Sequence, residues 1–185
     1  MRALVLSLAI ASLAGCSEAA PSSATSDIGG ALDASVLRRD PFDAAMYTSA
    51  SLELGTGLEA WQSVAPTGDR VELVHGPQGG YHILGRYRFE GFMPDVFAYF
   101  RVTPVEGGAP VNTPTVRLHR TSTAGLTRVG SGYQSTYAEL VIFTQISFPA
   151  EVVGHRFVWE LVLEEVSTGR YATTQREITV VDDVP

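Results

Sequence analysis

The sequence predicts an all-β domain, and three observations support this. Apolar and polar residues alternate with a period of two in several segments, as in strands with one buried face. Clusters of glycine and proline separate these segments, and no helical apolar stripe of more than roughly three turns follows residue 50. About seven to nine short strands separated by turn signals are typical of an antiparallel immunoglobulin-like β-sandwich, with a small β-barrel as the alternative.

The first fifteen residues predict an export signal that lies outside the fold. Arg2 precedes an apolar stretch from residue 3 to residue 13, and small residues and Cys16 follow it. This stretch is shorter than the roughly 20 apolar residues that a membrane-spanning helix needs. We therefore expect residues 1–15 to form a signal peptide that is removed during secretion.

The last residues of this signal, Leu13-Ala14-Gly15-Cys16, resemble the lipobox of bacterial lipoproteins. The resemblance implies cleavage before Cys16 and a covalent lipid on that residue, and it covers the export segment only. An ordinary signal peptide with a chance cysteine is the alternative, but Cys16 is the single cysteine of the chain, and an unpaired thiol in an exported protein needs an explanation. Ser17 follows, which in that family favours the outer membrane over the inner one.

Residues 16–48 are expected to be the lipidated cysteine and a flexible tether. The segment SEAAPSSATSDIGG carries one large apolar residue, too little to offset the entropy of ordering it. The remaining residues, 49–185, suffice for one domain with one core. With 13 basic residues, all arginine, against 20 acidic ones, the chain has a formal charge of −7, so no basic surface for nucleic acid is expected.

The alternation of apolar and polar residues indicates where the strands lie within residues 49–185. Phe157, Trp159, Leu161 and Leu163 share one face of the clearest segment, opposite Glu160. Trp159 and Trp61 are expected in the core or at its edge, and Ser167-Thr168-Gly169-Arg170 is expected to form a hairpin turn. The predicted strands cover residues 81–90, 96–102, 116–118, 140–146, 156–164 and 172–180.

The stretch HGPQGGYH, residues 75–82, is the main candidate for a binding loop. Pro77 presets the φ angle of a turn, and Gly79 and Gly80 permit positive φ where the chain reverses. A phosphate site is not expected, since a strand follows the loop and the chain has no lysine. The candidate binding residues are His75, Gln78, Gly79, Gly80 and His82.

A copper or zinc site is the alternative interpretation of this loop. If the flanking strands paired as a hairpin, His75 and His82 would face each other at about 5 Å. Such a site needs three or four ligands, and a third would have to come from His119, His155, Glu72 or Glu90. No HxH or HxxxH pair occurs, so the sequence favours a plain turn over a metal site.

No catalytic constellation is expected. Ser131 lies in VGSGYQ, which lacks the first glycine of a nucleophile elbow, and the carboxylates show no pairing suited to glycoside hydrolysis. Six tyrosines offer stacking surfaces but are more typical of core edges. The sequence therefore predicts a non-catalytic binding or structural module without a cofactor. It would be exported, anchored to the membrane by lipid, and able to bind an envelope protein or a glycan.

Overall fold

The computed structural model describes residues 40–43 and 50–182. The predicted signal peptide, Cys16 and the segment from residue 17 to residue 39 lie outside these residues. The described part contains twelve strands and three short 3₁₀ helices, and no helix in it is long and apolar enough to cross a membrane. The 3₁₀ helices are η1 (Pro41–Asp43), η2 (Thr121–Thr123) and η3 (Pro149–Glu151). The strands are β1 (Ser51–Thr56), β2 (Gln62–Ser63), β3 (Asp69–Glu72), β4 (Val74–His75), β5 (Tyr81–Glu90), β6 (Asp95–Pro104), β7 (Thr115–Arg120), β8 (Leu126–Val129), β9 (Gly132–Ser135), β10 (Glu139–Phe143), β11 (Arg156–Glu165) and β12 (Tyr171–Val181).

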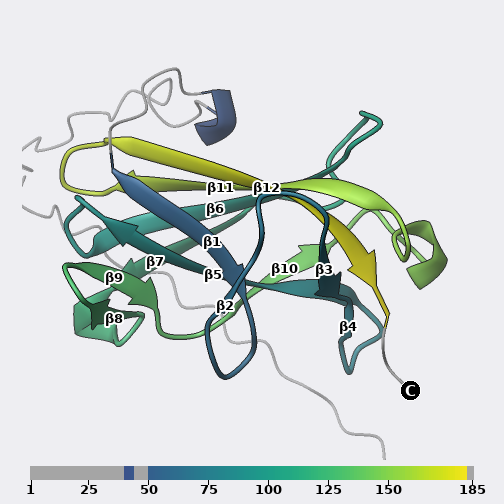
Figure 1. Ribbon diagram of the computed structural model, residues 1–185, viewed down its shortest axis with the longest axis horizontal. Coiled ribbons are helices and arrows are strands. Elements are labelled where there is room, and N and C mark those ends of the chain that lie inside the picture. Colours follow the sequence, from purple (N-terminus) through teal and green to yellow (C-terminus); the bar gives the residue numbers. More distant parts are fainter. Residues whose placement is uncertain (1–39, 44–49, 183–185) are drawn as a thin grey trace, which may run out of the picture. The chain divides into compact units, whose positions relative to one another are not determined.

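The strands form two sheets that pack as a sandwich, which confirms the predicted fold class (Figure 1). One sheet has the order β2-β1-β5-β9-β8, with β4 and β10 also paired to β5, and the other has the order β3-β12-β11-β6-β7. The predicted strand number was too low because strands of two to four residues, such as β2 and β4, are too short to show a period.

The sheets are not wholly antiparallel, contrary to the prediction. β3 pairs with β12 in the parallel sense, with Ile178 opposite Asp69 and Val181 opposite Glu72. Parallel neighbours need a long crossover in place of a hairpin, and most of the domain separates these two strands in the sequence.

The core lies between the inward faces of the two sheets. Val96, Ala98, Phe100 and Val102 on β6 are fully buried, as the alternation predicted, and so is Trp159 on β11. On β10, however, the predicted Leu140 and Ile142 are each 44% exposed, whereas Val141 and Phe143 are buried. β10 is apolar on both faces, so its period did not indicate which face turns inward.

Gly85, in the middle of β5, faces two aromatic rings of the other sheet. A Cβ atom at this position would lie 2.8 Å from the ring of Phe100 and 3.3 Å from that of Trp159. These two rings pack with centroids 6.3 Å apart. Because Gly85 has no side chain, the rings fill the space over β5 directly.

A bulge separates β9 from β10 along the same side of β5. Gln134 pairs with Arg88 and Glu139 with Gly85, so five residue steps on one strand oppose three on the other. The backbone N–H of Tyr87 donates to Ser135 Oγ at 3.2 Å, and Arg86 Nη2 donates to the carbonyl of Thr136 at 2.7 Å. Arg86 thus closes the bulge and is itself only 3% exposed.

Glu165 joins the β11–β12 turn to the loop between β5 and β6. The carboxylate of this fully buried side chain accepts from the backbone N–H of Met93 at 2.6 Å, from Arg170 Nε at 2.9 Å and from the hydroxyl of Thr168. Hydrogen bonding from Arg170, assisted by those from Met93 and Thr168, lowers the pKa of Glu165 to about 2. The turn itself is confirmed, with Gly169 at a φ of 65°.

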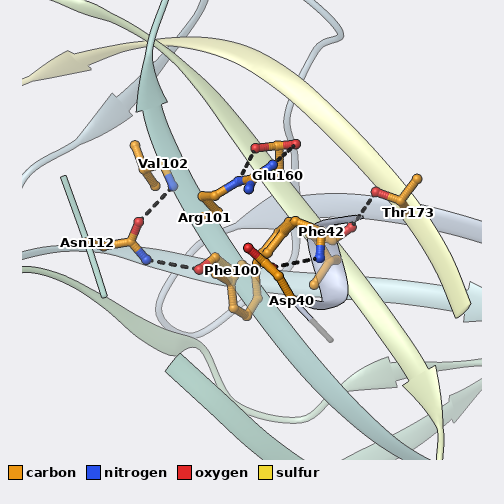
Figure 2. A network of polar contacts seen from close by, with 9 residues as sticks. Asp40, Phe42, Phe100, Arg101, Val102, Asn112, Glu160 and Thr173 are labelled. Atoms are coloured by element: carbon orange, nitrogen blue, oxygen red, sulfur yellow. Dashed lines mark hydrogen bonds and ion pairs between the residues drawn. The ribbon is translucent and has the colours of Figure 1, made fainter. Parts of the chain in front are cut away.

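The outer face of the five-stranded sheet holds the described N-terminal segment. Arg101 on β6 forms a forked pair with Glu160 on β11, at 2.6 and 3.0 Å, and its guanidinium lies 4.1 Å from the ring centroid of Phe42 in η1 (Figure 2). Beside it, Asn112 accepts from the N–H of Val102 at 2.7 Å and donates to the carbonyl of Phe100 at 2.9 Å. Phe42 thus packs on the guanidinium of Arg101, and the ion pair with Glu160 fixes the position of that guanidinium.

Candidate functional site

The predicted loop at residues 75–82 is a hairpin between β4 and β5. Gly79 has a φ of 81°, which few residues other than glycine tolerate. The N–H of Gly76 donates to the carbonyl of Gly80 at 2.7 Å and closes the turn. Gln78, Gly79 and Gly80 are exposed at its tip, so the loop is available to a partner.

The two histidines of this loop do not face each other, contrary to the expectation. His75 pairs with Tyr81 and His82 pairs with Val74, so the two imidazoles are on opposite faces of the hairpin. His75 Nε2 lies 3.0 Å from Asp182 Oδ2, and its ring packs edge-on against Tyr81 with centroids 5.2 Å apart. In the part of the chain that the structure describes, no three His, Cys, Asp or Glu side chains are grouped to hold a metal ion.

His82 instead joins an apolar surface on the outer face of the seven-stranded sheet. Partial burial lowers the pKa of His82, which favours the neutral imidazole. Val74 and Ile142 flank it on the neighbouring strands, and Leu140 lies opposite Leu84 two residues further along β5. We call these five residues the outer patch: Val74, His82, Leu84, Leu140 and Ile142.

The same face continues toward the C-terminal end of β5 with Arg86 and Arg88. Arg88 Nε donates to Gln134 Oε1 at 2.7 Å, and its guanidinium lies 4.3 Å from the ring centroid of Trp61. Trp61 packs over Gly55, where a Cβ atom would lie 2.5 Å from the ring. Beyond them lies a shallow depression of about 280 Å³, lined by Ser51, Glu53, Arg88, Glu90 and Gly132 among others.

A second polar group, which the sequence did not indicate, lies between the two sheets where β7 approaches β10. Glu139 lies opposite Gly85 and turns inward, with Arg117 Nε at 3.4 Å and His119 Nε2 at 3.2 Å. The His119 contact has ion-pair range but lacks the alignment of a hydrogen bond. The ring of Tyr87 packs edge-on against His119 with centroids 5.5 Å apart. Burial and the charge of Glu139 raise the pKa of Tyr87 well above its usual value, so the phenol stays protonated.

This inter-sheet group is suited to holding the sheets together. Glu139 links the edge strands through Arg117 and His119, and a backbone bridge between Asn112 and Phe143 links them further along. Its carboxylate lies within ion-pair range of two side chains of β7 and bridges the two sheets. The arrangement is therefore structural.

The other residues considered for catalysis also have structural partners. Ser131 Oγ donates to Glu90 Oε1 at 2.8 Å in the β8–β9 turn. Glu160 faces outward as predicted and pairs with Arg101. Neither side chain is presented as an activated nucleophile or as one of two carboxylates facing each other across a cleft.

Comparisons with known proteins give similarity at the level of the fold. No family model and no curated protein matches the chain. The two-sheet domain is structurally similar to the CooA pilin subunit from enterotoxigenic Escherichia coli, with 13% identity and a TM-score of 0.37, covering 71% of this chain and 99% of that one. It is also similar to the N-terminal domain of PorA, with 11% identity and a TM-score of 0.29, covering 70% of this chain and 97% of that one. Such low scores carry no conclusion about function.

Proposed function

We propose that this protein is an outer-membrane lipoprotein, anchored through Cys16, whose β-sandwich acts as a non-catalytic binding module for another envelope protein. The anchor is supported by the lipobox-like sequence Leu13-Ala14-Gly15-Cys16. The binding role is supported by one structural observation above all. Leu140 and Ile142 are each 44% exposed and lie beside Leu84 and His82 in one continuous outer patch.

The chemistry of this patch favours a protein partner. An isolated exposed leucine is ordinary, but adjacent apolar side chains on neighbouring strands form a surface that is stabilised when a partner excludes water from it. Glycans, by contrast, are bound mainly through aromatic stacking and hydrogen bonds, and the outer patch has no aromatic side chain other than the imidazole of His82. The exposed tip of the loop, Gln78 to Gly80, borders the patch and supplies polar contacts at its rim.

The lipid anchor is tested by metabolic labelling. Labelled palmitate should enter the full-length protein in its bacterial host and should be lost from a Cys16→Ala variant, since Cys16 is the single thiol of the chain. A Ser17→Ala variant, which retains the thiol, is the matched control and should label normally. Equal labelling of the Cys16→Ala variant and the parent would show that the chain is not a lipoprotein of this kind.

The binding surface is tested by photocrosslinking in intact cells. A photoreactive phenylalanine analogue at Ile142 should capture a discrete partner, whereas the same analogue at Thr173, exposed on the other sheet, should not. Adding Leu140→Ser next to the probe should reduce capture several-fold, because it removes apolar area from the interface. An adduct degraded by protease supports a protein partner. An adduct degraded by muramidase instead identifies a glycan, and equal capture from both positions rules out the outer patch.

A further inference from the structure

Among the described residues, no carboxylate lies within ion-pair range of either of two neighbouring arginines on the outer face of β5. Arg86 donates to the backbone carbonyl of Thr136, and its Nε is buried without a hydrogen-bond acceptor. Arg88, two residues along the same face, donates to the neutral amide of Gln134. Glu53 lies directly opposite Arg88 in the β1–β5 register, yet no ion pair joins them.

Other arginines in the described part of the chain do have carboxylate partners. Five other described arginines lie within ion-pair range of a carboxylate. These pairs are Arg101–Glu160, Arg117–Glu139, Arg120–Asp95, Arg156–Glu177 and Arg170–Glu165. These pairs account for half of the ten described arginines. Arg86 and Arg88 are in the other half, and they are neighbours on the face that carries the outer patch.

A buried guanidinium without a close counter-ion is costly. Arg86 is 3% exposed, and burial lowers the pKa of its guanidinium, which means that the charged form has lost hydration without gaining a counter-ion. Arg88 is partly exposed and lies about 7 Å along the strand from Arg86, so the two positive charges also repel each other. A carboxylate placed against Arg88 would offset the repulsion between the two arginines.

We propose that the partner protein contributes a carboxylate to Arg88, above Arg86, from a segment whose apolar side chains cover the outer patch. The proposal rests on the proposed function, because it names the chemistry of the partner that this face would bind. Leu84 and Arg88 are about 13 Å apart along β5, which equals four residues of an extended segment. The recognised segment therefore carries an apolar residue and an acidic residue four positions apart on one face.

Two blocked pentapeptides test this directly: acetyl-Leu-Ser-Leu-Ser-Glu-amide and its counterpart ending in Gln. They are titrated into the ¹⁵N-labelled protein while the arginine Nε–H resonances are followed by NMR. The Glu peptide should bind at least about tenfold more tightly than the Gln peptide, since a hydrogen bond to a charged acceptor is worth more than one to an amide. It should shift the resonances of Arg86 and Arg88 and leave that of Arg156, which is already paired, in place.

Variants that remove one arginine charge test whether Arg88 is responsible for the preference for the Glu peptide. Arg88→Gln should remove the preference for the Glu peptide, whereas Arg156→Gln, which deletes the same charge on the other sheet, should preserve it. Arg88 is the primary test because Arg86 also closes the bulge and its replacement is expected to perturb the fold. Equal binding of the two peptides, or no binding of either, overturns this inference. Capture of a protein from Ile142 that is unaffected by Arg88→Gln would leave the proposed function intact and refute the carboxylate alone.

Discussion

Replacing Glu165 with alanine should lower the free energy of unfolding by about 3 kcal/mol. The substitution leaves the N–H of Met93 without its acceptor and removes the counter-charge of Arg170, while the buried site gains nothing in return. The loop between β5 and β6 and the β11–β12 turn should loosen together. Urea unfolding followed by far-UV circular dichroism measures the change.

The pH dependence of this effect has a defined sign. Glu165 has a folded pKa of about 2, below its value in the unfolded chain, so its contribution is complete above about pH 4.5 and is lost as the pH falls toward 2. The stability difference between the parent and a Glu165→Gln variant should therefore shrink over that range. Glu177→Ala, which breaks the exposed pair with Arg156 in the same sheet, is the control and should lower stability much less, because solvent screens that pair. A Glu165→Gln variant as stable as the parent at pH 7 would contradict the proposed role of this carboxylate.

Trp159→Ala should be the most damaging change in the core, at about 3–5 kcal/mol. The indole is fully buried, packs against Phe100 and fills the space above Gly85. Its removal leaves a void between two central strands that cannot move closer without breaking their pairing with β10 and β12.

A milder variant separates packing from hydrogen bonding at this position. The indole Nε1 of Trp159 is buried without an acceptor, so Trp159→Phe removes an unsatisfied donor along with some volume. Trp159→Phe should lower the free energy of unfolding by less than half as much as Trp159→Ala. If the indole N–H donated a hydrogen bond, the loss of that bond would make the phenylalanine variant less stable than this. Trp61→Ala, at the partly exposed second tryptophan, should change global stability by about 1 kcal/mol or less. If Trp61→Ala proves the more destabilising, the core has been misassigned.

The fold class was predictable because strands with one buried face have a strong period-two signal. β6 and β11 show it clearly, and their inward residues are the ones the alternation selects. β10 and β7 do not show it. β10 is apolar on both faces, and on β7 His119 is buried while Val116, Arg117 and Leu118 are exposed. The apolar residues of β7 therefore do not mark its inward face, where His119 contacts Glu139.

The site could be predicted only in part for a related reason. Glycine and proline defined the turn at residues 75–82, and local geometry confirms it. The one-residue offset that separates His75 from His82 depends on the hairpin register, which composition alone does not determine. The burial of Arg86 depends on a bulge formed by residues about fifty positions later in the chain, and no local pattern around β5 indicates it.

The stacking of Phe42 on Arg101 has a mechanical consequence if the protein is tethered as proposed. From Cys16 the chain runs 24 residues to Asp40 and 34 residues to Ala50. These lengths limit the distance between the domain and the bilayer to about 85 Å while Phe42 packs on Arg101. Once that contact is broken, the limit rises to about 120 Å. A cation–π contact at a surface is worth only about 1 kcal/mol. A modest pull on the domain would therefore detach Phe42 and lengthen the reach of the domain by roughly two-fifths. The contact between Phe42 and Arg101 would thus hold part of the tether in reserve until force is applied.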